Sequence, residues 1–192
     1  MKKKKFPIRE ITVIAQFAAL TAACSWLQIP VFPIPFTMQT FAVFLTVYVL
    51  GVEKGFLSVA VYLLLGAAGL PVFSKFQGGA GVIAGPTGGY LVGFLLTTLA
   101  TGILLRLCRE RPVPVFLSMA AGLIICYFFG TAWFIILGRA QGSSITLSGA
   151  LHAAVLPFVI PDAVKIILAI LIGRKIKPVS DKYLKKHKNA EE

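Results

Sequence analysis

The sequence predicts an all-α integral membrane protein with six transmembrane helices and both termini in the cytoplasm. Hydrophobic residues make up 57% of the 192 residues, and the mean hydropathy is +0.86. Charged residues are only 14%, against about 25% in a typical soluble domain. The apolar residues fall in six runs, and the basic residues collect in alternate gaps between them. These observations exclude a disordered chain, a disulfide scaffold and an ordinary soluble enzyme.

The six apolar runs cover residues 11–29, 37–51, 55–70, 87–107, 112–137 and 149–173. A hydrocarbon core of ~30 Å needs about 20 helical residues, or fewer where a helix lies partly in a protein pocket. The second and third runs are short and are separated only by Val52, Glu53 and Lys54, which predicts a tight helical hairpin. We therefore expect a single transmembrane domain over residues 1–192, with basic cytoplasmic tails at 1–10 and 174–192.

The basic residues set the expected orientation, because cytoplasmic loops carry an excess of lysine and arginine. With both termini inside, the inner segments hold 16 of the 19 basic residues, and the outer loops hold only Lys75 and Arg139. The inner set is Lys2, Lys3, Lys4, Lys5, Arg9, Lys54, Arg106, Arg109, Arg111, Arg174, Lys175, Lys177, Lys182, Lys185, Lys186 and Lys188. The net charge of +12 is therefore explained by the orientation of the chain in a lipid bilayer, and we expect no nucleic-acid partner.

Two of the predicted outer loops are rich in residues that interrupt helices. The first loop contains three prolines, and the second contains six glycines: Pro30, Pro33 and Pro35, then Gly78, Gly79, Gly81, Gly85, Gly88 and Gly89. Irregular backbone at membrane depth is tolerated only where it lines a cavity or is covered by protein. We expect the outer loops to build or close a pocket at the outer face.

The sequence lacks the motifs of common enzymes. It contains no phosphate loop of the form GxxxxGK[ST], no HExxH and no GxSxG, so we expect neither catalysis nor ATP hydrolysis by this chain. The three cysteines, Cys24, Cys108 and Cys126, are widely spaced and form no CxxC pair. They predict buried apolar side chains rather than a metal site or a disulfide framework.

The clearest polar signal is an acid and a lysine inside the last apolar run, Asp162 and Lys165. Each costs ~2.5–3.5 kcal/mol at the bilayer centre, and residues three apart share one face of a helix. Pro161 suits a first helical turn, which would place both near an outer helix amino terminus that favours anions. One interpretation is a ligand site in which Lys165 receives a carboxylate and Asp162 accepts N–H groups. The alternative is a self-neutralising pair, or a lysine that reaches the surface.

Further polar and small residues are weaker candidates. Thr37, Gln39 and Thr40 begin the second run, and Gln77, Thr87 and Tyr90 surround the glycine-rich loop; each is either a ligand contact or a helix cap or packing contact. On the first run, Ala15, Ala19 and Ala23 recur every four residues and form a flat stripe that lets another helix approach closely. That helix belongs either to this chain or to a partner.

Three motifs together resemble the BioY family, the substrate-binding S components of biotin transporters of the energy-coupling-factor (ECF) type. They are Pro33-Ile34-Pro35-Phe36-Thr37-Met38-Gln39-Thr40, Gly85-Pro86-Thr87-Gly88-Gly89-Tyr90-Leu91 and Pro161-Asp162-Ala163-Val164-Lys165. The run Tyr62–Pro71 is also similar. The resemblance implies the ECF S-component fold in a bacterial plasma membrane and a biotin pocket that faces outward.

By the same resemblance, Asp162 and Lys165 contact the ligand, with Lys165 near the biotin carboxylate, and Gln77 is the candidate from the second outer loop. The alanine stripe would dock onto a transmembrane coupling subunit, which works with two ATPase subunits. Biotin would be the transported ligand, and no cofactor is expected. The other hypothesis is a self-sufficient carrier or channel for another small carboxylate.

Overall fold

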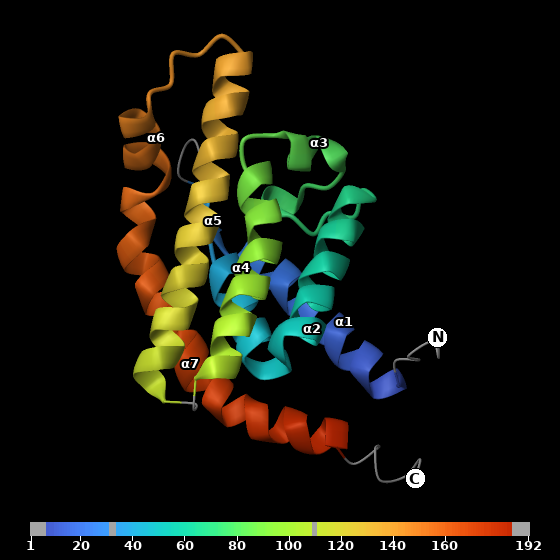
Figure 1. The fold of residues 1–192 in the computed structure, drawn as a ribbon. Coiled ribbons are helices and arrows are strands. Elements are labelled where there is room, and N and C mark those ends of the chain that lie inside the picture. Colours follow the sequence, from blue (N-terminus) through green and yellow to red (C-terminus); the bar gives the residue numbers. More distant parts are fainter. Residues whose placement is uncertain (1–6, 31–33, 109–110, 186–192) are drawn as a thin grey trace, which may run out of the picture.

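The computed structural model describes residues 7–30, 34–108 and 111–185. In this part of the chain, five helices are long and apolar enough to cross a membrane: α1 (Ile8–Trp26), α2 (Gln39–Ala67), α4 (Gly88–Leu107), α5 (Pro112–Ala140) and α7 (Leu156–Lys185). They form one bundle (Figure 1), and the predicted all-α membrane fold is confirmed. Several basic residues assigned to the inner side, and one outer-loop proline, lie outside the described residues: Lys2, Lys3, Lys4, Lys5, Arg109, Lys186, Lys188 and Pro33.

Helix α2 contains both the second and the third predicted runs, folded back on each other at Gly51. This glycine has φ 75° and ψ −175°, which interrupts the helix in a region that glycine adopts without steric cost. Gln39 Nε2 lies 2.6 Å from Tyr62 Oη, whereas an unbroken helix would separate residues 23 positions apart by roughly 35 Å. The two arms are therefore antiparallel, as the cyan-to-teal ribbon shows (Figure 1). The predicted hairpin is correct, with its turn at Gly51 instead of residues 52–54.

The outer loops contain short elements that the sequence pattern did not predict. Strand β1 (Gln28–Ile29) pairs antiparallel with β2 (Phe36–Thr37), so the first helix ends at Trp26 instead of residue 29. Pro30 favours an extended conformation in the residue before it, which fits a strand at this point. The glycine-rich loop forms a 3₁₀ turn, η1 (Ser74–Phe76), and a short helix, α3 (Ala80–Ala84).

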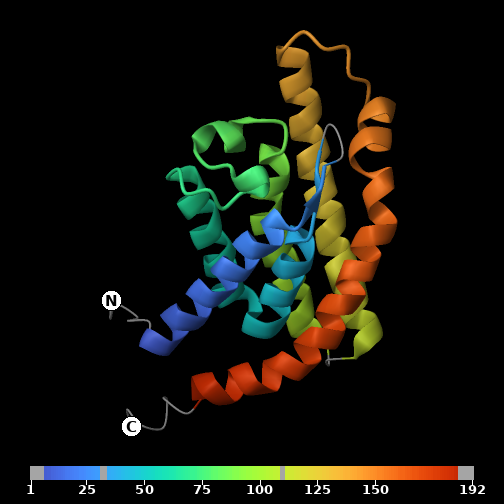
Figure 2. The same ribbon diagram turned by 180° about the vertical axis from the view of Figure 1, so that it is seen from behind.

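The last predicted run is divided into two helices. Helix α6 (Leu147–Ala154) is followed by Val155, whose φ of −129° and ψ of −61° interrupt the helix, and α7 begins at Leu156. Helix α7 then continues to Lys185, so residues 174–185 of the predicted tail are helical. Figure 2 shows this last part turning across the end of the bundle toward the start of α1, where an Arg9 guanidinium nitrogen donates to the backbone oxygen of Tyr183 at 3.2 Å.

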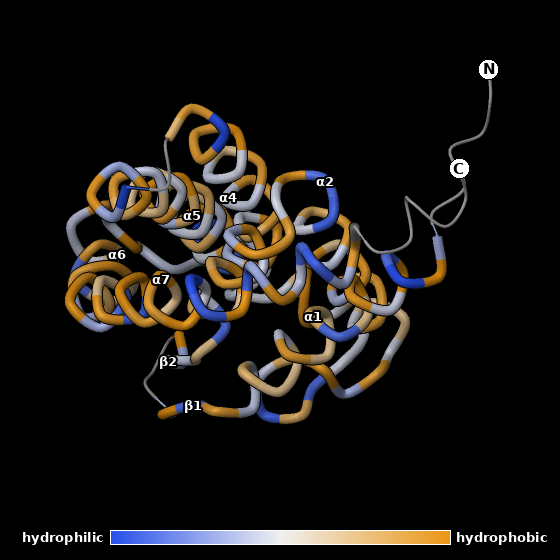
Figure 3. The backbone as a smooth tube through the Cα atoms, turned by 90° about the horizontal axis from the view of Figure 1, so that it is seen from below, coloured by the Kyte–Doolittle hydropathy of each residue, from blue (hydrophilic) through white to orange (hydrophobic). Residues whose placement is uncertain are grey.

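The described basic residues of the predicted inner side gather at one end of the bundle. Lys54 Nζ lies 2.8 Å from Glu10 Oε1, and Arg106 lies 3.7 Å from Glu53. These contacts bring the start of α1, the turn of α2 and the end of α4 together, and Lys177 of α7 lies over the ring of Tyr48. Viewed from this end, hydrophilic segments occur at the helix ends and turns while the helices are largely hydrophobic (Figure 3). The arrangement agrees with two termini on the same side of a membrane.

Close helix packing holds α4 and α5 together through small residues. A Cβ atom on Gly89 would overlap the side chain of Trp133, and one on Gly122 would overlap the hydroxyl of Thr101. The Cys24 and Cys126 side chains are buried as predicted, whereas Cys108 is only partly buried at the end of α4, where its sulfur lies 3.3 Å from Ser118 Oγ. This packing fixes α5 and thereby the polar side chains that it carries toward α7.

Candidate functional site

Asp162 and Lys165 form a buried ion pair on one face of α7. Lys165 Nζ lies 2.7 Å from Asp162 Oδ1, and the two residues are only 3% and 2% exposed. The spacing of three residues places both on the same side of the helix, as the sequence predicted. Because α7 begins at Leu156, however, Asp162 lies beyond the first helical turn. The prediction that the pair lies at a helix amino terminus is therefore wrong, because Pro157 and not Pro161 lies in the first turn of α7.

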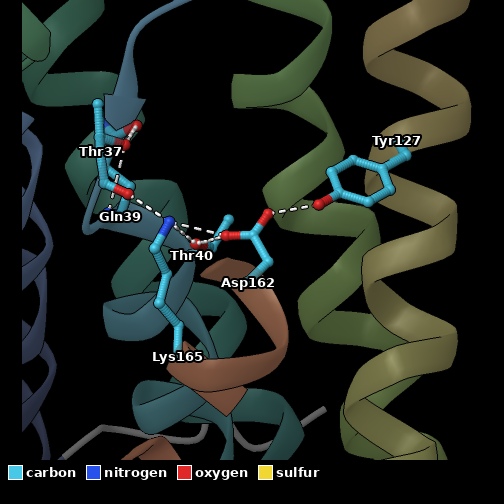
Figure 4. Close-up of polar contacts among 6 residues, drawn as sticks. All are labelled: Thr37, Gln39, Thr40, Tyr127, Asp162 and Lys165. Atoms are coloured by element: carbon cyan, nitrogen blue, oxygen red, sulfur yellow. Dashed lines mark hydrogen bonds and ion pairs between the residues drawn. The ribbon is translucent and has the colours of Figure 1, made fainter. Parts of the chain in front are cut away.

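Strand β2 and the start of α2 complete the hydrogen bonds of the lysine. Lys165 Nζ donates to the backbone oxygen of Thr37 at 2.6 Å and to Thr40 Oγ1 at 3.0 Å (Figure 4). Together with Asp162 these give three acceptors for the three N–H bonds of the ammonium group. Thr40 in turn donates its hydroxyl to Asp162 Oδ1 at 2.9 Å. A ligand oxygen can bond Lys165 only by replacing one of these acceptors.

Helix α5 supplies a contact that the sequence analysis missed. The Tyr127 hydroxyl donates to Asp162 Oδ2 at 2.6 Å (Figure 4), so each carboxylate oxygen has at least one donor. A tyrosine hydroxyl in the middle of an apolar membrane helix needs a partner, because water is absent there. That requirement is the sequence signal that would have singled out Tyr127. The pair is thus held by α2, α5 and α7 at once.

One aromatic ring lies over the ammonium group, and a second ring stacks on the first. Lys165 Nζ lies 3.9 Å from the centre of the Phe36 ring, a distance at which the ring attracts a cation. Phe36 stacks on Phe158, with 6.3 Å between ring centres and 8° between planes. The β1–β2 strand pair, which carries Phe36, therefore positions part of the site.

These residues lie on the wall of a cavity with an empty volume of about 660 Å³, part of which is open to solvent. Apart from the polar cluster, much of the wall is apolar and includes Ile34, Val82, Leu91, Phe94 and Phe158. A hydrophobic chamber with one concentrated polar patch suits a small molecule that has both an apolar part and hydrogen-bonding groups.

The other predicted residues divide into those that reach the cavity and one that does not. Gln39, Thr87 and Tyr90 line it. Gln39 donates to the Tyr62 hydroxyl, and the Tyr90 hydroxyl lies 3.3 Å from the oxygens of Thr131 and Ala154. Gln77 is exposed and is absent from the wall.

The turn in the second outer loop explains where Gln77 lies. A short antiparallel bridge joins Phe73 and Gln77, in which the backbone N–H of Phe73 donates to the backbone oxygen of Gln77 at 2.9 Å. Phe73 is 1% exposed and lines the cavity together with Ser74. The inward position that the sequence analysis assigned to Gln77 is therefore taken by residues earlier in the turn.

The alanine stripe on α1 faces outward. Ala15, Ala19 and Ala23 are exposed, whereas Ala18 and Ala22 are buried against the rest of the bundle. The stripe therefore does not pack against another helix of this chain, which was one of its two interpretations. Over residues 7–30, 34–108 and 111–185, no group of three or more His, Cys, Asp or Glu side chains forms a metal site.

The fold and the site together define a helical membrane protein with a mostly apolar cavity between its helices. The BioY family model matches residues 1–182, and this chain belongs to the BioY family. It is 41% identical over 170 residues to the biotin transporter BioY of Thermotoga maritima, covering 88% of this chain and 96% of that protein. It is 37% identical over 169 residues to the probable biotin transporter BioY of Pyrococcus horikoshii, with the same coverage.

A solved structure gives the same result for the fold. The crystal structure of the S-component for biotin from an ECF-type ABC transporter matches this chain with a TM-score of 0.80 and 27% sequence identity. The match covers 89% of this chain and 92% of that one, so the predicted S-component fold is confirmed. The relatives are named as transporters, in agreement with the prediction that this chain is not an enzyme.

Proposed function

We propose that this chain is the biotin-binding S component of an ECF transporter in the cell membrane. It captures biotin at the outer face and delivers it inward together with an ATP-driven coupling module. The observation that carries the proposal is the buried Asp162–Lys165 pair on the wall of a mostly apolar cavity, in a chain of the BioY family. Biotin is cargo, and no cofactor is required.

The chemistry of biotin suits this cavity. Its ureido ring carries N–H donors and a carbonyl acceptor, its side chain is apolar and its carboxylate is anionic. Asp162 Oδ2 accepts one hydrogen bond, from Tyr127, and a carboxylate oxygen has room for a further donor. Lys165 supplies the positive charge for the ligand carboxylate, in exchange for one of its present acceptors. Gln39, Thr87 and Tyr90 are the further polar groups that reach the ligand.

Calorimetric titration of the purified protein with biotin and with biotin amide tests these roles. Biotin is expected to bind more tightly than the amide, because only the acid offers an anion to Lys165. Equal affinities would show that Lys165 does not receive the carboxylate, although the protein still binds biotin. No binding of either compound would contradict the proposed function itself.

The coupling module is proposed to dock on the alanine stripe of α1. The support is that Ala15, Ala19 and Ala23 are exposed and lie on one face, where the absence of large side chains allows a second helix to approach closely. We propose a transmembrane coupling subunit and two ATPase subunits as the partners. ATP hydrolysis by these subunits would supply the energy for transport.

A bulky side chain on the stripe should separate binding from transport. Ala19→Phe is expected to keep biotin affinity but to lower ATP-dependent uptake in vesicles that contain the coupling and ATPase subunits. Ile103→Phe, at an exposed position of α4, is the control and should retain uptake. Equal uptake by both variants would contradict docking at the stripe. Uptake without the ATPase subunits would instead favour a self-sufficient carrier.

A further inference from the structure

A long apolar groove runs along the seam between α5 and the α6–α7 segment. Its outer part has an empty volume of about 1390 Å³, including open space, and is lined by side chains of α5, α6 and α7 such as Ile124, Phe128, Leu151 and Val159. A second hollow of about 610 Å³ continues toward the inner end, lined by residues that include Val113, Ile167 and Arg174. Phe116 borders both hollows, so we describe them together as the α5–α7 groove.

The outer part of the groove offers almost nothing to a polar ligand. The hydroxyls in its lining belong to Tyr127 and Thr131, and both are engaged inside the protein. Tyr127 donates to Asp162, and Thr131 Oγ1 lies 3.3 Å from the Tyr90 hydroxyl. Several lining side chains are strongly exposed, including Ile124 at 67% and Phe128 at 69%. The part of an occupant that lies in the outer groove must therefore be a hydrocarbon.

The inner end of the groove is cationic. Arg174 lines it, Lys175 follows in the chain, and Arg111 directly precedes Pro112, which is also part of the lining. All three basic residues are exposed. Basic side chains at the inner surface attract anionic lipid headgroups. From Phe116 to Tyr127 the groove follows 11 residues of helix, or roughly 16 Å, which is about half of a ~30 Å hydrocarbon core.

We propose that the α5–α7 groove holds one anionic phospholipid of the inner leaflet. Its headgroup lies at Arg111, Arg174 and Lys175, and an acyl chain follows α5 to the ring of Tyr127, near the middle of the bilayer. The location favours lipid over the coupling module. Helices α5 and α6 and the part of α7 that lines the groove lie on one side of the bundle and α1 on another (Figure 3), so docking at the alanine stripe leaves the groove facing the bilayer.

Native mass spectrometry of the purified protein tests the headgroup contacts. Phosphatidylglycerol and phosphatidylcholine with identical acyl chains are added in equal amounts, and the unmodified protein should retain one phosphatidylglycerol in preference. Each basic residue near the surface contributes about fivefold to such binding. Arg111→Gln with Arg174→Gln should therefore reduce the preference by about 25-fold. Arg139→Gln, an exposed arginine at the other end of α5, is the matched control and should retain it.

A second variant tests the acyl-chain contacts. Ala120→Phe with Ala163→Phe places two rings in the groove and should release the bound lipid whatever its headgroup. Val92→Phe on α4, an exposed position outside the groove, should not. Melting temperatures in the same detergent show whether each variant folds. If the Ala120→Phe/Ala163→Phe variant does not fold, the Arg111→Gln/Arg174→Gln variant, whose changes are at exposed positions, still tests the proposal. An unchanged preference for phosphatidylglycerol in the Arg111→Gln/Arg174→Gln variant would overturn the proposal. So would a dimer of the unmodified protein that is lost only in the Ala120→Phe/Ala163→Phe variant, because a second copy of the chain would then occupy the groove.

Discussion

Removing one charge of the buried pair should harm folding more than removing both. Asp162→Asn keeps the shape of the side chain but leaves the Lys165 ammonium, 3% exposed, with neutral acceptors only: the oxygens of Thr37 and Thr40 and the oxygen of the introduced amide. Loss of one partner of a buried ion pair costs about 3–5 kcal/mol of folding stability. Replacing both partners by well-packed uncharged side chains of similar volume often leaves the stability unchanged. We therefore expect Asp162→Asn with Lys165→Met to be more stable than Asp162→Asn alone.

Thermal unfolding in detergent measures this difference. For a soluble chain of similar length, 1 kcal/mol corresponds to about 2–4 °C in Tm, so Asp162→Asn should lower Tm by roughly 6–20 °C. The double variant should recover most of that loss. Glu53→Gln is the control, because its ion pair with Arg106 is long, at 3.7 Å, and more than 60% exposed on both sides. Such a surface pair contributes about 0–1 kcal/mol.

Biotin titration of the same variants separates a binding role from a structural one. A hydrogen bond to a charged group is worth about 1.5–3 kcal/mol, so both variants should lose about 10- to 150-fold in affinity. Near-normal affinity in the stable double variant would refute a binding role for the pair. A double variant as unstable as Asp162→Asn would refute the interpretation of the two residues as a compensated ion pair.

Three further predictions follow from the contacts around the pair. Tyr127→Phe leaves Asp162 Oδ2 without its donor and should lower Tm by several degrees and biotin affinity by about tenfold. An unchanged Tm and an unchanged affinity would show that this hydrogen bond contributes to neither stability nor binding. Gln39→Ala should weaken biotin binding, whereas Gln77→Ala should bind like the unmodified protein because its side chain is outside the cavity; the reverse order in titrations would contradict the assignment. Gly89→Ala should cost about 1–3 kcal/mol in unfolding experiments because its Cβ overlaps the Trp133 side chain, whereas Gly81→Ala, with open space around it, should not.

The membrane architecture could be predicted because it depends on patterns that are local in the sequence. The runs of apolar residues and the basic gaps directly reflect the length of a bilayer crossing and the charge asymmetry of its two sides. The hairpin of α2 was visible because its two runs are short and nearly adjacent. Its turn is at Gly51, where the positive φ depends on backbone geometry that residue types indicate only approximately.

The second outer loop was harder to predict because its order comes from long-range contacts. The Trp133 indole donates to the backbone oxygen of Gly85 at 2.9 Å, and the Ser25 hydroxyl donates to the backbone oxygen of Val72 at 2.6 Å. These contacts decide which side chains face the cavity. Nothing in the glycine-rich sequence distinguishes Phe73 and Ser74, which line the wall, from Gln77, which does not.

The polar cluster was predicted in part, and the reason lies in where its members come from. Asp162 and Lys165 share one helix, so their spacing alone places them together. Thr40 and Tyr127 are 122 and 35 residues from Asp162 in the sequence and meet it only because α2, α5 and α7 pack around a common core. Burying two charges is tolerable only when their hydrogen bonds are largely satisfied. The presence of an acid and a lysine in an apolar helix therefore implies donors and acceptors on neighbouring helices, and hydroxyl side chains at the same depth are where they should be sought.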